Sequence, residues 1–165
     1  MPPANQVGWW LSDEAGYRQI GDSFLYAGQY NSQTYVSLVR FDLNKVARGA
    51  VIRSAVLKLT GLRSEGITPD TPNRWIVQFV AEDALPDFVT PDFLTVFTAP
   101  AAITLLPELS PVALGVGVVN EWHLDKTVRQ WLEQQLLDGA TSVTVRIMAS
   151  ANGAGALFAW DSGHG

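Results

Sequence analysis

Residues 35–41 read YVSLVRF. Every second residue of an extended chain lies on the same face, so positions 35, 37, 39 and 41 share one face and the residues between them share the other. This period of two, with its many apolar side chains, predicts a β-strand. The same period occurs in residues 55–60 (AVLKLT), 75–80 (WIVQFV) and 143–148 (VTVRIM). Shorter strands are predicted at residues 7–11, 23–27, 118–124 and 157–160.

Turn-forming residues separate the predicted strands, for example ARGA at 47–50 and TPDTPN at 68–73. Strands that recur with turn signals, and without alternating helices, indicate an all-β sandwich or barrel. The chain has 165 residues, of which 47% are apolar, and it has no cysteine. It is therefore expected to form one domain whose core needs neither a disulfide nor a metal.

One helix is predicted over residues 126–137. Its apolar residues have the spacing of a single helical face, and they are Val128, Trp131, Leu132 and Leu136. Asp125 can cap the start of this helix, and Gly139 can end it. We expect the helix to cover one end or edge of the strands.

Residues 84–117 are rich in proline and apolar residues, which indicates a long ordered loop with short strands at 94–97 and 103–105. The predicted core combines apolar residues from the long strands and the helix. They are Phe41, Leu57, Leu59, Val77, Phe79, Trp131, Leu132, Val145 and Ile147.

The charge distribution argues against two classes of partner. The net charge is −5, and the 11 basic residues are scattered along the sequence. Binding to nucleic acid or to an anionic membrane surface requires clustered lysine and arginine. We therefore expect neither nucleic acid nor a membrane as a partner.

No group of residues has the pattern of a catalytic site. The two histidines, His123 and His164, lie far apart and accompany no serine motif. Acidic residues that could form a pair, as in glycosidases, occur at 13–14, 82–83 and 87/92, where turns and strand ends are predicted. Solvated or capping carboxylates are the simpler interpretation, so we expect no catalytic residue and no enzymatic activity.

The tryptophans are the best candidates for a ligand-binding surface. One of the neighbours Trp9 and Trp10 must point outward from an alternating strand, and Trp160 lies near the other end of the chain. An exposed indole can stack on a sugar ring or insert into a protein partner. The alternative is that a loop or the helix covers these rings.

Calcium is the only cofactor that the acidic residues suggest. Asp13, Asp22, Asp83 and Asp161 lie near predicted loops, and Ca²⁺ prefers oxygen ligands of this kind. Their spacing does not match a calcium-binding loop of the EF-hand type. The alternatives are a structural calcium site and ordinary surface carboxylates.

Three segments resemble domains of the DNRLRE type and the related alginate-binding carbohydrate-binding modules. The first is residues 39–59 (VRFDLNKVARGAVIRSAVLKL), similar to the family pattern of an RFDL strand, a GA turn and an alternating strand. The second runs from EWHLD at 121–125 to WL at 131–132, and the third is FAWDS at 158–162. Their order and spacing match the family from about residue 9 to residue 162.

The resemblance implies an antiparallel, jelly-roll-like β-sandwich with one short α-helix at about 126–137. Such domains are non-catalytic parts of large extracellular or cell-surface prokaryotic proteins, and some of them bind polysaccharide. The start of this chain lacks the basic and apolar segments of a signal peptide, so the alternatives are a protein that stays inside the cell and an excised domain. The resemblance favours an excised domain of a larger extracellular protein. The expected function is that of a glycan-binding or spacer module.

Domains of this family usually finish with an apolar strand after the segment that corresponds to 158–162. Here only Gly163, His164 and Gly165 follow. We therefore expect the domain of residues 1–165 to lack its final strand. The alternative function is a structural assembly or adhesion unit, which a β-strand from another segment or chain completes.

Overall fold

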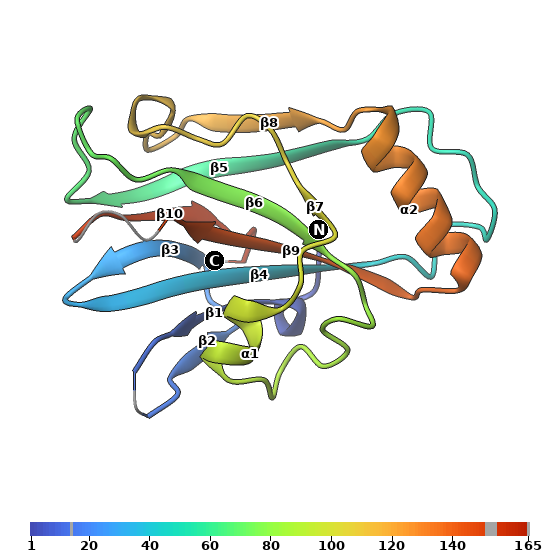
Figure 1. The fold of residues 1–165 in the computed structure, drawn as a ribbon, viewed down its shortest axis with the longest axis horizontal. Coiled ribbons are helices and arrows are strands. Elements are labelled where there is room, and N and C mark those ends of the chain that lie inside the picture. The colour runs from blue at the N-terminus through green and yellow to red at the C-terminus, as the bar shows by residue number, and fades with distance from the viewer. Residues whose placement is uncertain (14, 151–154, 165) are drawn as a thin grey trace.

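The computed structural model describes residues 1–13, 15–150 and 155–164, and antiparallel β-sheet is their main regular secondary structure. One ten-stranded sheet curls around a common core (Figure 1). Its strands are β1 (Val7–Leu11), β2 (Arg18–Ile20), β3 (Phe24–Tyr30), β4 (Gln33–Asp42), β5 (Val56–Glu65), β6 (Trp75–Val80), β7 (Ile103–Thr104), β8 (Val119–His123), β9 (Ser142–Ala149) and β10 (Leu157–Asp161). The helices are α1 (Phe93–Thr98) and α2 (Lys126–Asp138), with short 3₁₀ turns at Ala4–Gln6 and Pro111–Ala113.

The predicted all-β class and antiparallel pairing are confirmed. The order along the sheet is β7-β6-β9-β4-β3-β10-β5-β8, and β1 pairs with β4 and β2. Because the sheet is continuous and curled, strands from both of its halves face one core, to which β6, β9, β5 and β8 all contribute. The jelly-roll arrangement of two separate sheets stays a prediction.

A change of neighbour at Gly28 produces much of the curl. β3 pairs with β4 only up to Gly28↔Tyr35, and from Ser37 onward β9 occupies that edge of β4. The other part of β3 pairs instead with β10. Gly28 has a φ of 131°, and a Cβ placed on it would lie 2.2 Å from the carbonyl oxygen of Ala156. Only glycine fits at this crossing of backbones.

Helix α2 closes one end of the core, as predicted. Asp125 accepts a hydrogen bond from Val128 N at 2.9 Å, and Gly139 ends the helix in the left-handed conformation with a φ of 88°. Val128, Leu132 and Leu136 are buried. Trp131 is only half-buried, against Phe79 at a ring separation of 5.7 Å.

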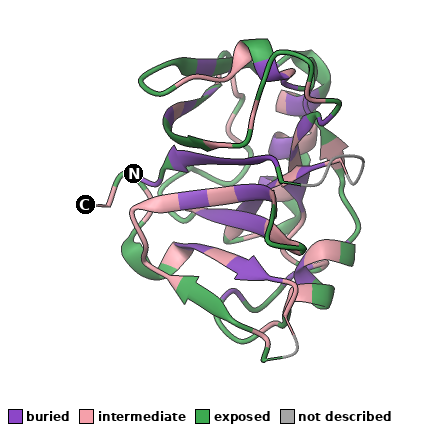
Figure 2. Cartoon of the chain, turned by 90° about the vertical axis from the view of Figure 1, so that its left-hand side faces the viewer, coloured by how far each residue is buried: buried purple, intermediate pink, exposed green. Residues whose placement is uncertain are grey.

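The buried core agrees with the predicted one except at two positions. Figure 2 shows that buried residues follow the strands, whereas the loops are largely exposed. Phe41 and Trp131 were expected in the interior, but both are half-buried because they lie at the margin of the core. The other predicted core residues are buried; these are Leu57, Leu59, Val77, Phe79, Leu132, Val145 and Ile147.

The expected strand at residues 94–97 and the expectation of a single helix are wrong, because this segment lies inside helix α1. Asp92 caps the helix by accepting from Thr95 N at 2.7 Å. Phe93 and Phe97, one turn apart, stack at 5.2 Å. The apolar run alone is compatible with either a strand or a helix. The cap at Asp92 and the i,i+4 contact between the two rings favour the helix.

A second core lies between α1, the loop before it and the outer face of the sheet. Its buried members are Trp10, Val36, Leu38, Val80, Leu85, Phe88, Val96 and Ala99. Two buried arginines fasten this cover to β4 and β9. Arg40 donates to the carbonyls of Leu85 and Pro86, while Arg146 donates to those of Val96, Phe97 and Ala99. Burial lowers the pKa of both guanidinium groups.

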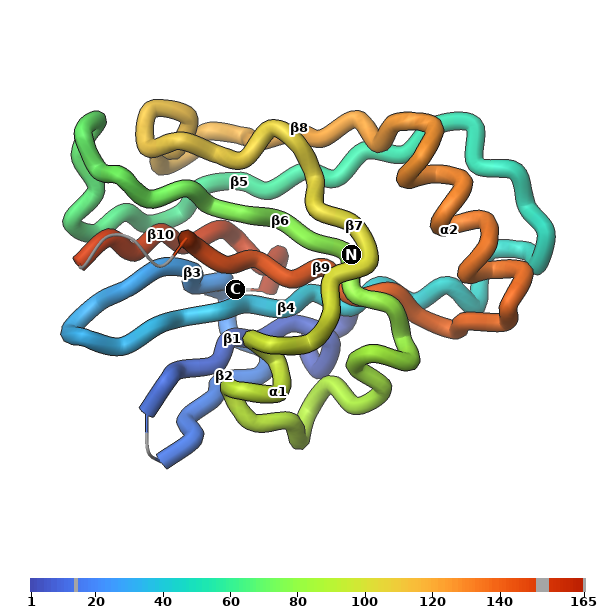
Figure 3. The backbone as a smooth tube through the Cα atoms, viewed as in Figure 1, coloured from blue at the N-terminus to red at the C-terminus, as the bar shows by residue number. Residues whose placement is uncertain are grey.

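The chain between β7 and β8 crosses from one end of the sheet to the other (Figure 3). Leu109 exchanges backbone hydrogen bonds with Trp75 of β6. Further along, Ala113 O accepts from Asn120 Nδ2 of β8 at 2.9 Å, and Pro107 O accepts from Trp122 Nε1 at 3.3 Å. This segment therefore connects β6 with β8 and partly closes the curl.

The closing segment of the chain contains β10, which lies between β3 and β5 and pairs with both. Beyond it, Ser162 N donates to Ser23 O at 3.0 Å, and a ring nitrogen of His164 lies 2.8 Å from Pro2 O. Gly165, where a missing final strand was expected to begin, lies outside the described residues. The absence of that strand stays a prediction.

We predict that Gly28→Ala destabilises the protein far more than Gly117→Ala. Both glycines have positive φ, which costs an alanine about 1–3 kcal/mol. A Cβ at Gly117 would meet nothing within 4 Å, whereas one at Gly28 would collide with Ala156 O. Urea denaturation of the two variants measures the difference, and equal losses would show that β3 does not cross at Gly28 as described.

We also predict that Arg146→Met lowers the free energy of unfolding by about 2–4 kcal/mol, because it leaves the carbonyls at the end of α1 without a donor. Arg53→Met is the control, since Arg53 is exposed, and its effect should stay within about 0.5 kcal/mol. Similar stabilities of the two variants in chemical denaturation would contradict the anchoring role of Arg146.

Candidate functional site

Five aromatic side chains gather at the surface where β3 leaves β4. We call this group the aromatic cluster; its members are Trp9 (β1), Tyr17, Phe24 and Tyr26 (both β3) and Tyr35 (β4). The ring of Trp9 lies 5.4 Å from Tyr17, 5.5 Å from Tyr26 and 5.7 Å from Tyr35. Phe24 and Tyr26 stack at 5.3 Å with their planes 14° apart. Trp9 is thus the centre of the cluster.

Strand alternation places these rings together. Leu25 and Ala27 of β3 point into the main core, so Phe24 and Tyr26 lie on the opposite face. Trp9 is paired with Ser37 of β4, whose hydroxyl donates to the carbonyl of Tyr26 at 2.8 Å. This bond holds β3 beside the Trp9 position, which lets rings from separate strands meet.

The cluster is accessible to solvent. Tyr17 is 48% exposed, and the other four rings are neither fully buried nor fully exposed. Contact of several neighbouring aromatic rings with water is energetically unfavourable, and such exposed apolar patches are typical of binding surfaces.

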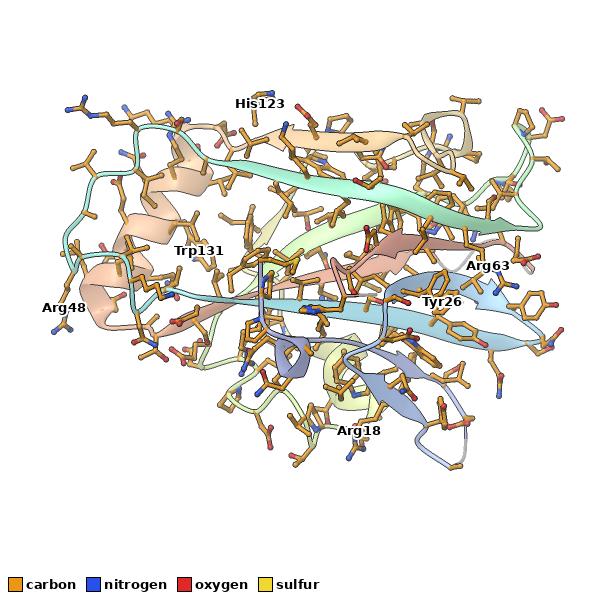
Figure 4. The ribbon with its side chains drawn as sticks, turned by 180° about the vertical axis from the view of Figure 1, so that it is seen from behind. Arg18, Tyr26, Arg48, Arg63, His123 and Trp131 are labelled. Carbon is orange, nitrogen blue, oxygen red and sulfur yellow. The ribbon has the colours of Figure 1, made fainter. Side chains whose placement is uncertain are left out.

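Polar groups border the aromatic cluster on two sides. Asp22 Oδ2 accepts from Trp9 Nε1 at 2.7 Å, and Gln19 Oε1 accepts from the Tyr17 hydroxyl at 3.2 Å. On the other side, Arg63 of β5 donates to Glu65 Oε1 at 2.6 Å. Figure 4 shows Arg63 close to Tyr26. Hydrogen-bond donors and acceptors therefore flank the rings.

Two groups at this surface have pKa values that fix their charge, Arg63 at the border and Tyr35 within the aromatic cluster. Hydrogen bonds to Glu65 and to Tyr26 raise the pKa of the Arg63 guanidinium, which stays charged. Burial raises the pKa of the Tyr35 hydroxyl, and Tyr26, Tyr30 and Asp13 raise it further. Tyr35 is consequently a neutral hydroxyl that can both donate and accept at physiological pH.

Of the three tryptophans predicted to bind a ligand, only Trp9 lies at the surface. Trp10 and Trp160 are 0% exposed. Trp10 packs on Phe88 in the second core and donates to Pro91 O, and Trp160 packs on Phe158 in the main core and donates to Asn120 Oδ1. Both rings are covered on every side, so they are removed from the candidate surface.

The four candidate calcium ligands do not come together. Asp22 is engaged with Trp9, Asp13 accepts from Tyr17 N, and Asp161 accepts from Gly163 N. Asp83 lies in a separate exposed turn after β6. Among residues 1–13, 15–150 and 155–164, no three His, Cys, Asp or Glu side chains are grouped as metal ligands.

The acidic residues considered for catalysis have structural partners where they are described. Glu82 accepts from Thr141 and Ser142, and these bonds lower its pKa despite the opposing effect of burial. Asp87 accepts from Val89 N and Thr90 N, and Asp92 caps α1. Glu14, the partner of Asp13 in the first pair, lies outside the described residues.

Sequence reasoning missed four members of the aromatic cluster: Tyr17, Phe24, Tyr26 and Tyr35. A signal was present in the predicted strand 23–27, where aromatic residues alternate with apolar core residues. Two aromatic rings on the face opposite the core indicate that another part of the chain or a ligand covers that face. The meeting of that face with Trp9 depends on the path of β3, which the pattern does not reveal.

No family model matches the chain, and no curated protein matches it. None of the helices in the described ranges is long and apolar enough to cross a membrane.

We predict that Asp22→Ala destabilises the protein by about 1–3 kcal/mol, because the partly buried indole N–H of Trp9 loses its acceptor. Asp22→Asn retains a carbonyl oxygen at this position and should cost less. Thermal and urea denaturation compare the two variants. If they are equally stable, Asp22 does not orient Trp9.

Proposed function

We propose that this domain is a non-catalytic glycan-binding module whose binding surface is the aromatic cluster. The observation that carries the proposal is the group of five accessible aromatic rings around Trp9, bordered by Asp22, Gln19, Arg63 and Glu65. Sugar rings have apolar C–H faces and polar hydroxyl edges. A surface of rings with hydrogen-bonding groups at its margin complements both.

The angles between the rings favour one class of glycan. Tyr26 is inclined by 88° to Trp9, and Tyr17 and Tyr35 are inclined to it by 42° and 44°. Rings at such angles cannot all lie flat against a crystalline polysaccharide face. They suit a single, twisted glycan chain whose successive residues present different orientations.

The resemblance to extracellular carbohydrate-binding modules supports the same function and a location at the cell surface or outside the cell, within a larger protein. It is also the basis for proposing that the domain has no activity of its own. Binding through exposed aromatic rings needs no nucleophile, acid–base pair or metal.

The test is binding to a panel of soluble polysaccharides (alginate, xylan, mixed-linkage β-glucan and hydroxyethyl cellulose) by affinity electrophoresis and calorimetry. We predict that Tyr17→Ala and Tyr26→Ala each weaken binding to the preferred polymer at least about tenfold, because aromatic anchors carry a large share of binding energy. Both variants should keep the parent's melting temperature within a few degrees.

His123→Ala is the control, because His123 is a largely exposed ring of β8 that lies away from the aromatic cluster. It should bind as the parent does. Lack of binding to every polymer, or equal losses in Tyr26→Ala and His123→Ala, would contradict the proposal. Release of reducing sugar from a bound polymer would contradict its non-catalytic part.

A further inference from the structure

Half of strand β5 has a neighbour on only one side. Val56–Thr60 pair with β8, while β10 pairs with β5 only at Gly61 and from Arg63 to Glu65. No strand within the described ranges pairs with Val56–Thr60 on the β10 side. The ladder that β10 forms along β5 therefore stops half-way.

The free edge carries backbone groups that point away from β8. Ala55 O and Gly61 N are bonded to the β8 side, at Leu124 N and Val118 O. Backbone groups of successive residues alternate in direction along a strand. Val56, Lys58 and Thr60 thus direct their N–H and C=O groups to the unpaired side, and such a row of groups is a template for an added strand.

An apolar groove runs along this free edge. Its volume is about 400 Å³, and its apolar lining comes from Leu25, Val39, Phe41, Leu57, Leu59 and Val145. An apolar cavity of about 150 Å³ holds one benzene molecule, so this groove has room for two or three apolar side chains. Asp161, Ser162 and Gly163 form one part of its wall, and Met1 and Pro2 form another.

The edge and the groove together define one kind of occupant. We propose that β5 accepts an extended peptide strand that pairs with Val56–Thr60 in line with β10 and antiparallel to β5. Side chains opposite Leu57 and Leu59 then enter the groove, because paired residues project to the same face. The occupant is a segment of about five residues with apolar residues at the second and fourth positions.

Two other occupants fit less well. Both ends of the described chain lie beside the groove, near each other (Figure 2). Pro2 and Pro3 lack N–H groups, so the start of the chain cannot form a ladder with β5. The same edge of a second copy could not fill the groove, because its Leu57 and Leu59 point into the core of their own molecule.

The test uses the peptide acetyl-Thr-Val-Thr-Val-Thr-amide with the full chain. Because a ligand selective for the folded state stabilises it, we expect the melting temperature to rise by about 5–10 °C at a hundredfold excess over the dissociation constant. The same peptide with N-methyl groups on its pairing amides should produce no rise. The peptide site on Val56–Thr60 shares no residue with the aromatic cluster. Tyr26→Ala should therefore bind the peptide normally, and the two proposals can fail separately.

A pair of variants at Lys58 locates the binding. Lys58→Pro removes an N–H from the free edge and leaves the β8 ladder intact, because Pro is tolerated where the N–H has no partner. It should abolish the melting-temperature rise, whereas Lys58→Ala should retain it. If Lys58→Pro fails to fold, the N-methylated peptide alone decides the matter.

Equal stabilisation by the normal and methylated peptides, or none by either, would overturn the proposal. A dimer of the peptide-free protein that Lys58→Pro dissociates in sedimentation measurements would also overturn it, in favour of a second copy on this edge.

Discussion

The contact between Gly28 and the carbonyl of Ala156 is the constraint on which the arrangement of strands depends. Because no side chain intervenes there, β3 can leave β4 and continue beside β10, and β9 can take its place on β4. The departure has two consequences. It curls the sheet around one core, and it carries Tyr26, with Phe24 stacked on it, to the position where Tyr26 meets Trp9 and Tyr35. Fold and candidate site thus share one cause.

The buried arginines explain why neighbouring tryptophans have different environments. Arg40 and Arg146 hold the segment of residues 81–99 over the outer face of β4 and β9, although burial opposes their charge. Carbonyl groups, including those at the end of α1, compensate this cost, as is favourable for a cation at a helix C-terminus. Trp10 is enclosed beneath that cover, whereas Trp9 points to the other side of β1 and joins the aromatic cluster.

Local pattern predicted α2 and every strand except the three-residue β2, because period two and helical spacing are properties of neighbouring residues. It failed at residues 94–97, where the run LTVF suits a strand and a helix equally and Asp92 decides between them. It also could not tell which tryptophans are covered. Residues 157–160 (LFAW) are all apolar, so their pattern does not show which face is covered; β10 lies centrally between two strands, and Trp160 is buried with Phe158 in the main core. The candidate site was predicted only through Trp9, because its other rings meet through contacts between strands distant in sequence.

The most direct test of the account is the response of the six tryptophan indole N–H signals in ¹H–¹⁵N NMR spectra during titration with short fragments of the preferred polysaccharide. If the aromatic cluster is the binding surface, the Trp9 signal shifts progressively to saturation, while the buried Trp10, Trp75 and Trp160 serve as internal references. A Trp9 signal that stays in place at saturation, or shifts concentrated on another tryptophan, would contradict the account.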